Sequence, residues 1–275
     1  MSHNQLITLL SDFGLKDVYV GVMKGVIAQI NPRLTVIDLT HEIPPQNLAA
    51  ARFNLMNAYP YFPVGTVHVA VVDPGVGSHR RGIALQIDAG FLVGPDNGLF
   101  SGVLQQTRVL GAVELTNPEY WRTPIPSTTF HGRDIFASVG AHLACGVSLE
   151  QLGESIDPKT LVQLAIPPHT PTASGIVGCI QYIDRFGNLI TNIPGTEVRG
   201  KTWSVIVGDS LTQRLHHRMI PSSQTYSDRP LGEVVALIGS HGWVEIAVNG
   251  GNAQQVLQMD WAAPVEVVVS QPITG

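Results

Sequence analysis

A change of hydrophobic periodicity past the middle of the chain is the feature that most constrains its fold. Before it, short β-branched runs that close on Asp, Gly or Pro alternate with segments of helical spacing at residues 19–30, 48–61 and 132–145. After it, runs such as GIVGCIQYID, TWSVIVGD and VEVVVSQ are typical of strands, and helical spacing nearly disappears. The segment LAIPPHTPTASG, which holds three prolines, lies between the two parts and has the composition of a linker.

These patterns predict two domains in a chain of 275 residues. Residues 1–166 are expected to form an α/β N-terminal domain with a mainly parallel sheet covered on both faces, because strands alternate with helices. Residues 167–174 are the predicted linker, and residues 175–275 are expected to form a smaller all-β, barrel-like C-terminal domain. Asn47 is expected to cap the helix at 48–61.

Composition and charge exclude several classes of protein. A hydrophobic fraction of 44% with 13% charged residues indicates a well-buried globular protein and argues against disorder. A net charge of -5 without a basic block argues against a nucleic-acid partner. No apolar stretch approaches the roughly 18–20 residues of a membrane helix, so no membrane association is expected. The opening MSHNQLITLLSDFG lacks the features of a signal peptide, which predicts a cytoplasmic location.

The cysteines, histidines and glycines do not match common cofactor motifs. Cys145 and Cys179 form no CxxC pair, which predicts two buried thiols, with a disulfide bond as the less favoured alternative. The stretches HGRD and THE place His near acids without convincing ligand spacing, so no metal site is expected. GVGSHRRG fails as a dinucleotide fingerprint, because its third glycine would fall on Arg80 and a strand follows the loop.

Polar residues gather where the predicted strands of the first domain end. They are Asp12, Asp17, Asp73 and the pair Asp96–Asn97. Ligands of open α/β sheets bind at the carboxyl ends of the strands, although any one of these acids alone is better explained as a turn or helix cap. Taken together they predict a site suited to ribose hydroxyls or to a cationic ligand.

His131 stands at the predicted start of the helix at 132–145, where a helix N-terminus would lower the pKa of its ring. The alternative is a hydrogen-bonded structural histidine. Arg80 and Arg81 are likewise open to an ordinary interpretation as a solvated pair at a sheet edge.

Two glycine-containing turns of the second domain carry side chains suited to a purine nucleoside. IDRFGNLITNI holds Asp184, Phe186 and Asn188, an arrangement that offers an aromatic platform and an amide, or simply a tight turn with Gly187 at positive φ. GSHGWVEIAVNGGNA similarly presents Ser240, Trp243 and Asn249 around glycines.

Six segments in order are similar to one enzyme family: SDFGLKDVYVGVMKG, VVDPGVGSHRR, GPDNG, TFHGRDIF, IDRFGN and EIAVNGGNA. Together they resemble the S-adenosylmethionine-cleaving enzymes, which include the fluorinase, the chlorinase and the adenosylmethionine hydrolases. The resemblance covers nearly the whole chain. It implies an α/β domain followed by a β-barrel, a homotrimer with active sites between subunits, S-adenosyl-L-methionine as the substrate, and no cofactor.

The resemblance also implies a role for individual residues. Asp12 matches the residue that holds both ribose hydroxyls, Phe186 the aromatic that stacks on adenine, and Asn188 the amide that contacts the purine edge. The other residues expected on the substrate side lie near the methionine group or beside these motifs; they are Asp17, Asn97, Asp184, Ser240 and Asn249. One position differs: His241 stands where the fluorinase has an arginine near the methionine carboxylate.

Three residues distinguish the hydrolases of this family from its halogenases. Asp73, Arg80 and His131 match the Asp–Arg–His set of the hydrolases, whereas the fluorinase has a tyrosine in place of Asp73. Gly132 stands where the fluorinase has a halide-binding serine. The resemblance therefore implies hydrolysis to adenosine and L-methionine by activated water, with Asp73 as the base or as the residue that orients Arg80. A halogenase and a non-catalytic adenosylmethionine sensor are the alternatives.

Overall fold

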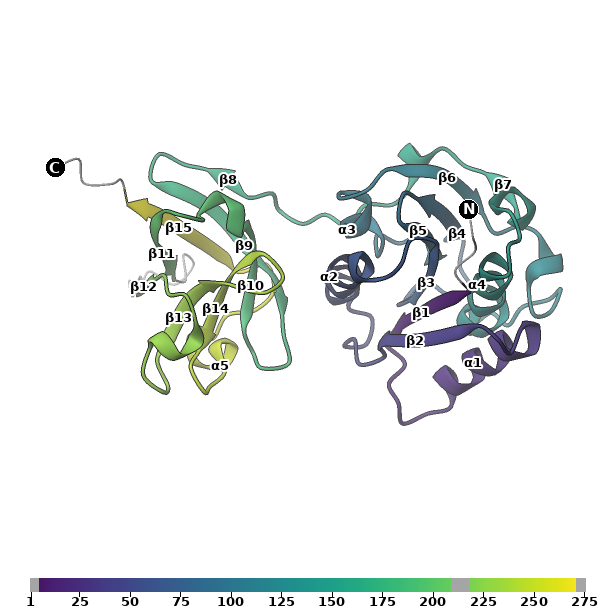
Figure 1. Ribbon diagram of the computed structural model, residues 1–275, viewed down its shortest axis with the longest axis horizontal. Helices are drawn as coiled ribbons and strands as arrows, with labels where there is room; N and C mark the ends of the chain where they lie inside the picture. Colours follow the sequence, from purple (N-terminus) through teal and green to yellow (C-terminus); the bar gives the residue numbers. More distant parts are fainter. Residues whose placement is uncertain (1–4, 209–217, 271–275) are drawn as a thin grey trace. The chain divides into compact units, whose positions relative to one another are not determined.

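The computed structural model describes residues 5–208 and 218–270 of the chain (Figure 1). The chain divides into two compact units, Met1–Leu164 and Ala165–Gly275. Each unit has its own sheet and its own hydrophobic core. The finer division predicted from the sequence, with a linker at 167–174, stays a prediction.

The first unit is built on a sheet whose strand order is β2-β1-β3-β5-β4-β6-β7. The strands β2, β1, β3 and β5 pair in parallel, whereas β4, β6 and β7 add an antiparallel part. The bounds are β1 Leu6–Ser11, β2 Thr35–Thr40, β3 Thr66–Val71, β4 Gly82–Ile87, β5 Gly90–Pro95, β6 Val109–Glu114 and β7 Glu154–Ser155. The run of fully buried residues in β3 is typical of a parallel strand with both faces covered.

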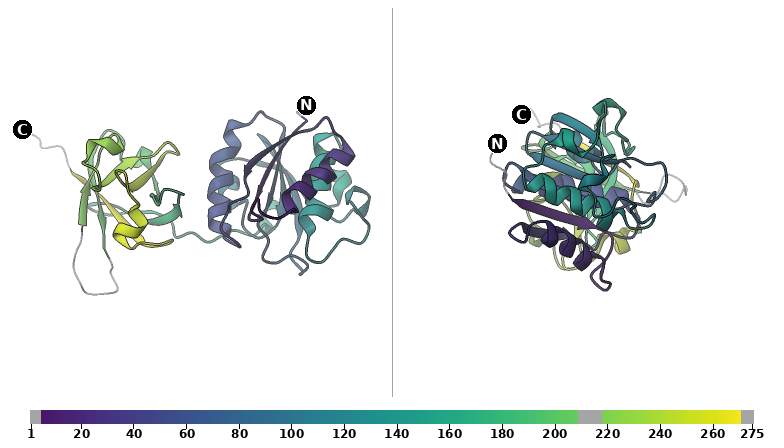
Figure 2. Two further views of the ribbon diagram at one scale, coloured as in Figure 1. Left: turned by 90° about the horizontal axis from the view of Figure 1, so that it is seen from below. Right: turned by 90° about the vertical axis from the view of Figure 1, so that its right-hand side faces the viewer.

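Helices cover both faces of this sheet, as Figure 2 shows. α1 (Tyr19–Ile30) and α4 (Ala137–Ala144) pack together on one face, and α2 (Leu48–Ala58) lies with α3 (Ser101–Leu104) on the other. Asn47 caps α2 as predicted, because its side chain accepts the N–H of Ala50 at 2.9 Å. The predicted α/β domain is thereby confirmed.

The predicted helix at 132–145 begins differently from an ordinary α-helix. Residues Gly132–Phe136 form a π-helical turn, and α4 continues from it to Ala144. Cys145 caps the end of α4 and is exposed, so the prediction that both cysteines are buried was wrong for this one. A helix that ends at the surface exposes its C-cap. Cys179 is buried as predicted, and both thiols are free.

The second unit is an antiparallel, nearly closed barrel, which confirms the predicted all-β fold. Its order is β12-β11-β15-β9-β10-β14-β13, with β8 paired to β9. A bridge between Ser222 and Ala236 brings the two ends of this order together. The bounds are β8 Thr170–Pro171, β9 Gly175–Ile183, β10 Leu189–Pro194, β11 Thr202–Val207, β12 Arg218–Pro221, β13 Val234–Ile238, β14 Trp243–Val248 and β15 Pro264–Ser270, with a short helix α5 at Ala253–Leu257.

Short 3-10 turns complete the connections, at Tyr59–Tyr61, Pro118–Tyr120, Leu149–Leu152, Pro158–Thr160, Gly195–Glu197 and Tyr226–Asp228. Within residues 5–208 and 218–270, none of the helices combines the length and apolar character needed to cross a bilayer.

Candidate active site

A cavity of about 400 Å³ lies in the first unit at the carboxyl ends of β1 and β3. These neighbouring parallel strands are in register at Ser11 and Val71, so the residues that follow them emerge at the same edge of the sheet. Asp12 comes directly after β1 and Asp73 comes two residues after β3, and both line the cavity. The segment that precedes the π-helical turn supplies another part of the wall, including Phe130 and His131.

Asp73, Arg80 and His131 form one continuous hydrogen-bonded chain beside this cavity. Arg80 Nε donates to Asp73 Oδ1 at 2.9 Å, and Arg80 Nη2 donates to Asp73 Oδ2. The same Nη2 lies 2.8 Å from His131 Nδ1. The side chains of Asp73 and Arg80 are only 5% and 11% exposed, so each offsets the buried charge of the other.

The glycine loop brings these groups together. Gly77 has φ +76°, and a Cβ there would lie 2.2 Å from the carbonyl oxygen of Thr128. Only glycine allows this approach between the loop after β3 and the segment that leads to His131. The guanidinium of Arg80 lies 5.2 Å from the centre of the buried Phe136 ring, which holds it on its second side.

His131 is a neutral ring in this arrangement. A guanidinium is a donor only, so Nδ1 of His131 must accept from Arg80 and the ring proton stands on Nε2. Burial lowers the pKa of His131, and the charge of Arg80 lowers it further, although Asp73 and Asp134 act in the opposite direction. The pKa is lowered in the direction that the sequence predicted, with burial as the largest cause and the charge of Arg80 as the second.

Asp12 is oriented by the main chain of a separate loop. Its Oδ2 accepts the N–H of Gln46 at 2.8 Å, and Gln46 has a left-handed backbone with φ +64°. A non-glycine residue in that region is strained, so the carboxylate and the strained turn are held together. Gln46 also lines the cavity, and the sequence reasoning did not single it out.

An aromatic cluster on the cavity wall was also missed. The ring of Phe130 meets those of Phe13 and Tyr19 edge-on, with centroids 5.6 and 5.3 Å apart. A Cβ on Gly132 would lie 3.2 Å from this Phe130 ring. The only available signal was the place of these residues inside the segments SDFGLKDVYVG and TFHG.

The other two residues predicted in the first unit lie apart from the cavity lining. Asp17 is exposed in the turn before α1. Asn97 braces the loop beside Asp73, since its Nδ2 donates to the carbonyl of Val72 at 2.8 Å and its Oδ1 accepts the N–H of Leu99 at 3.2 Å.

In the second unit, Asp184 organises the turn between β9 and β10. Its Oδ1 accepts the N–H groups of Phe186 and Asn188 at 2.9 Å each, and its Oδ2 accepts from Asn188 Nδ2 at 3.0 Å. Gly187 has φ +81°, as a tight turn requires. The ring of Phe186 is 74% exposed, so this turn presents an aromatic face outward while Asn188 stays buried.

The turn between β13 and β14 carries Ser240 and His241. Ser240 is exposed, whereas His241 folds back so that its Nε2 lies 3.0 Å from Oε2 of the buried Glu245. Tyr226 donates its hydroxyl to the other oxygen of Glu245 at 2.8 Å. His241 Nδ1 accepts the N–H of Trp243, so its Nε2 proton is directed to Glu245. Beyond this turn, Asn249 Nδ2 donates to the carbonyl of Arg229 at 2.6 Å.

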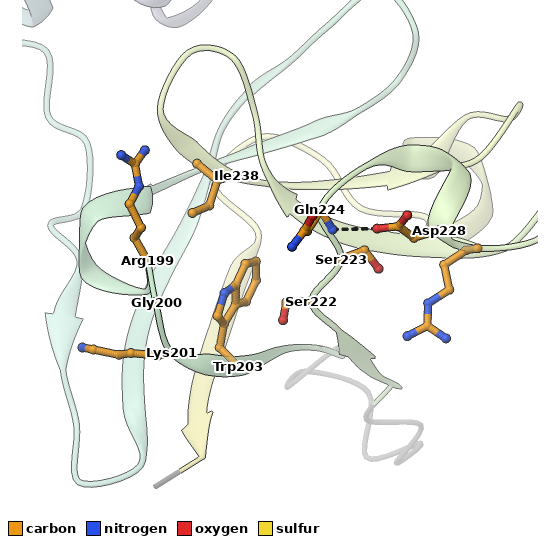
Figure 3. Close-up of a pocket in the computed structure, with 10 residues that line it drawn as sticks. Arg199, Gly200, Lys201, Trp203, Ser222, Ser223, Gln224, Asp228 and Ile238 are labelled. Atoms are coloured by element: carbon orange, nitrogen blue, oxygen red, sulfur yellow. Dashed lines mark hydrogen bonds between the residues drawn. The ribbon is translucent and has the colours of Figure 1, made fainter. Parts of the chain in front are cut away.

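A larger hollow of about 940 Å³ in the second unit gathers none of the predicted residues (Figure 3). Its lining includes Trp203, and the charged side chains of Arg199 and Lys201 point away from that ring. Asp228 accepts the N–H of Gln224 at 2.8 Å, so its charge serves the local turn. The cationic groups do not converge on one point, and this hollow is the weaker candidate.

Among the residues that the structure describes, His, Cys, Asp and Glu side chains form no group of three or more that could hold a metal ion. The candidate site itself offers a carboxylate, a guanidinium and a neutral imidazole beside a strand-end cavity.

Known proteins and family models are similar to this protein over nearly its whole length. Family models of the SAM hydroxide adenosyltransferase N-terminal and C-terminal domains match residues 7–153 and 178–266. Proteins named (R)-S-adenosyl-L-methionine hydrolase from Salinispora tropica and Thermus thermophilus are 41% and 40% identical to this chain, over 94% of it and 95% and 98% of their own lengths. A fluorinase from Nocardia brasiliensis is 28% identical over 96% of this chain and 97% of its own.

A solved structure is similar over the same extent. The crystal structure of an uncharacterized conserved protein from Thermotoga maritima has a TM-score of 0.87 and 36% identity, and covers 95% of this chain and 99% of that protein. Both domain models and the curated relatives indicate the same family. This chain belongs to the S-adenosylmethionine (SAM) hydroxide adenosyltransferase family.

Proposed function

We propose that this protein hydrolyses S-adenosyl-L-methionine to adenosine and L-methionine, and that Asp73, Arg80 and His131 activate the attacking water. The single observation that carries the proposal is their continuous hydrogen-bonded chain beside the cavity that Asp12 also lines. The curated relatives carry the (R)-epimer in their names, so we propose the sulfonium of (R) configuration as the preferred substrate.

The leaving group of this reaction needs no activation, whereas the nucleophile does. Displacement at the ribose 5′-carbon releases methionine as a neutral thioether, which needs no general acid. Water is a weak nucleophile at neutral pH, and general-base assistance accelerates such steps by roughly 10²–10⁴. Holding the water in line with the carbon–sulfur bond contributes further, because it removes the entropy of a bimolecular encounter.

In the proposed mechanism Asp73 takes a proton from water as the oxygen attacks. Each oxygen of an ionised carboxylate has two lone pairs, so a carboxylate held by Arg80 still has acceptor capacity for a water. His131 donates its Nε2 proton to the water oxygen and fixes its position, while Arg80 stabilises the developing hydroxide. The alternative within this scheme is that Asp73 only orients Arg80.

The proposed substrate contacts come from both units. Asp12 binds the ribose hydroxyls, Phe186 stacks on adenine, and Asn188 contacts the purine edge. The methionine part is proposed to meet the remaining residues of the set, with Asn97 and Asn249 supporting the loops around it; this set is Asp17, Asn97, Asp184, Ser240 and Asn249. Water is the only co-reactant in this scheme, so we propose that no cofactor takes part.

We further propose a cytoplasmic homotrimer with active sites shared between subunits. The support is the resemblance to trimeric enzymes and the exposure of Phe186, a large aromatic that would gain from a covering partner or ligand. Phe186 and Asn188 belong to the second unit, while Asp12 and Asp73 belong to the first.

A halogenase is the alternative within the family, and a non-catalytic sensor is the alternative outside enzymes. The lower identity to the fluorinase and the presence of Asp73 favour the hydrolase over a halogenase. The intact Asp–Arg–His chain argues against a sensor, because a binding protein has no need of a water-activating set.

The test is a product analysis in isotopically labelled water. The protein is incubated separately with the two sulfonium epimers in H₂¹⁸O, with and without added chloride or fluoride, and the products are identified by mass. Adenosine carrying ¹⁸O at its 5′-hydroxyl, formed faster from the (R)-epimer, is the expected result. A 5′-halo-adenosine would establish the halogenase, and binding without turnover would establish the sensor.

A further inference from the structure

A second group of interacting side chains runs from the buried last residue of β1 to a partly exposed residue of β2. Ser11, the last residue of β1, has its Oγ 2.7 Å from His41 Nδ1. His41 Nε2 lies 3.1 Å from Asp38 Oδ1, and Lys24 Nζ donates to Asp38 Oδ2 at 2.6 Å. Ser11 and His41 are 1% and 3% exposed, whereas the Asp38 side chain is 34% exposed. None of these residues takes part in the proposed water activation.

The donors and acceptors along the side chains of Ser11, His41 and Asp38 can be assigned in one consistent order. Burial alone would raise the pKa of Asp38, but the Lys24 and His41 contacts outweigh it and the pKa is lowered, so this carboxylate is ionised. An ionised carboxylate only accepts, so the 3.1 Å contact favours a proton on His41 Nε2; it is an electrostatic contact, because this nitrogen has no partner of hydrogen-bond geometry among the residues described. His41 Nδ1 then accepts the hydroxyl of Ser11.

A serine, a histidine and an aspartate whose side chains contact one another in this order also occur in nucleophilic hydrolases. Here that role is excluded by access, because the Ser11 side chain is buried and outside the lining of the 400 Å³ cavity. A nucleophile must reach the substrate within about 3–3.5 Å. Any role of these three residues at the cavity must therefore pass through a residue that does reach it.

The residue that reaches it is Asp12, which stands in the turn that this group holds. Ser11 Oγ accepts the N–H of Phe13 at 3.3 Å, and the carbonyl of His41 accepts the N–H of Gly14 at 2.8 Å. Gly14 has φ +67°, so the turn is sharp and its shape depends on these contacts. Both sides of Asp12 are thus tied, directly or through Ser11, to one buried histidine.

We propose that Ser11, His41 and Asp38 are positioning residues that hold the Asp12 carboxylate in the orientation needed to bind the two ribose hydroxyls of the substrate. The inference rests on the proposed function, which gives Asp12 that role. A carboxylate that accepts two hydroxyls at once needs a fixed plane, and loss of the supporting contacts weakens binding before it affects the chemistry at a separate residue.

The test compares two buried hydroxyls on the same strand. Ser11→Ala removes the Ser11–His41 contact. Thr8→Val is the matched control, because Thr8 is also in β1 and its Oγ1 lies at the same 2.7 Å from Nδ1 of the buried His68. We expect Ser11→Ala to raise the Kd for adenosine and the KM for the substrate about tenfold, with kcat within about threefold of wild type. Thr8→Val is expected to lower the thermal unfolding midpoint and leave Kd within about twofold.

A conservative substitution and a double variant distinguish a loss of Asp12 positioning from a general loss of stability. Ser11→Thr keeps the hydroxyl and is expected to restore most of the affinity. Asp38→Asn changes a partly exposed residue, so it keeps the inference testable if Ser11→Ala does not fold; it is expected to raise Kd about threefold. Combined with Ser11→Ala it is expected to add little, because both changes act on one group.

The inference is overturned if adenosine binds folded Ser11→Ala or Asp38→Asn as it binds wild type, or if Thr8→Val weakens binding equally. A wild-type protein that fails to bind adenosine or to release methionine instead overturns the proposed function, and the inference with it. The two failures are distinguished by the wild-type measurement.

Discussion

At the scale of single residues, Arg80 explains why three side chains that are distant in sequence act as one unit. Its planar guanidinium has donors on two sides, so it binds the Asp73 carboxylate through two nitrogens and still donates to His131. A lysine has one nitrogen and cannot make this fork. The position of the carboxylate and the tautomer of the imidazole are therefore set by the same group.

Replacing Asp73 by Asn is the most direct test of the proposed base. The amide keeps the size of the side chain but loses its basicity, so we expect turnover to fall by roughly 10²-fold or more while substrate affinity is approximately retained. Single-turnover release of methionine measures the effect.

Asp96→Asn is the matched control, because Asp96 is a buried carboxylate paired with Arg81 at 2.5 Å and lies outside the cavity lining. This variant is expected to lose stability and keep its turnover. Normal turnover in Asp73→Asn would remove Asp73 as the base and leave it the role of orienting Arg80.

The pH dependence of kcat/KM tests the neutral state of His131. Its pKa is lowered from 6.5, so the ring stays neutral to a lower pH than an ordinary histidine does. Protonation turns Nδ1 into a donor that opposes Arg80, so activity is expected to fall only as pH drops through a pKa below 6.5. A profile from pH 4.5 to 8 measures this, and His131→Asn is expected to flatten the acid limb. An acid limb centred at or above 6.5 in wild type would contradict the assignment.

At the scale of secondary-structure elements, the sequence predicted those features that depend on residues close together in the chain. The helix at 48–61 and its Asn47 cap follow from apolar spacing and one side-chain oxygen, and both are present. The π-helical turn at 132–136 was not predicted, and part of its hydrogen bonding is to residues outside the turn. Its Asp134 accepts from Arg122 at 2.6 Å and from the N–H of Ser127 at 2.9 Å. Such contacts have no signature in the local sequence.

In the candidate site, the sequence placed Asp73 at a strand end beside a glycine turn and a basic pair, whereas its pairing with Arg80 was suggested only by the resemblance. The contact with His131 spans 51 positions and was suggested only by the resemblance. The cluster of Tyr226, His241 and Glu245 was not anticipated at all, because a buried glutamate in a β-strand gives no sign of the turn residues that its side chain contacts.

The pairing of β1 with β3 provides a prediction about stability. Thr8 and His68 are opposite each other in the parallel register, and His68 is buried. Burial lowers the pKa of His68 from 6.5 to about 4. The unfolded chain therefore binds a proton that the folded chain excludes, and the folded state loses stability as pH falls from 6.5 to 4.

The loss attributable to His68 is about 3 kcal/mol across that range. Urea unfolding at a series of pH values measures it, and the contribution of His68 is the difference in slope between wild type and His68→Gln. Other groups titrate equally in both proteins and cancel in the difference. Parallel curves for the two proteins would show that His68 titrates alike in the folded and unfolded states.

At the scale of the whole molecule, the proposed site draws on two units that fold around separate cores. The first unit carries the water-activating set and Asp12, and the second carries Phe186 and Asn188. The proposed site would combine one unit of each kind, either from one chain or from two. The exposed ring of Phe186 and the resemblance to trimeric enzymes favour two.

Mixing two inactive variants decides between these arrangements. Asp73→Asn is defective in its first unit and Asn188→Ala in its second, and each alone is expected to be nearly inactive after dissociation and reassembly. If every site combines units from neighbouring subunits, random mixing in equal amounts pairs a normal first unit with a normal second unit in about one quarter of the sites. Activity is then expected to recover to about one quarter of the wild-type value, with mixed trimers verified by native mass spectrometry. If each site is built within one chain, every site keeps one defect, and verified mixed assemblies that stay inactive would exclude sites shared between subunits.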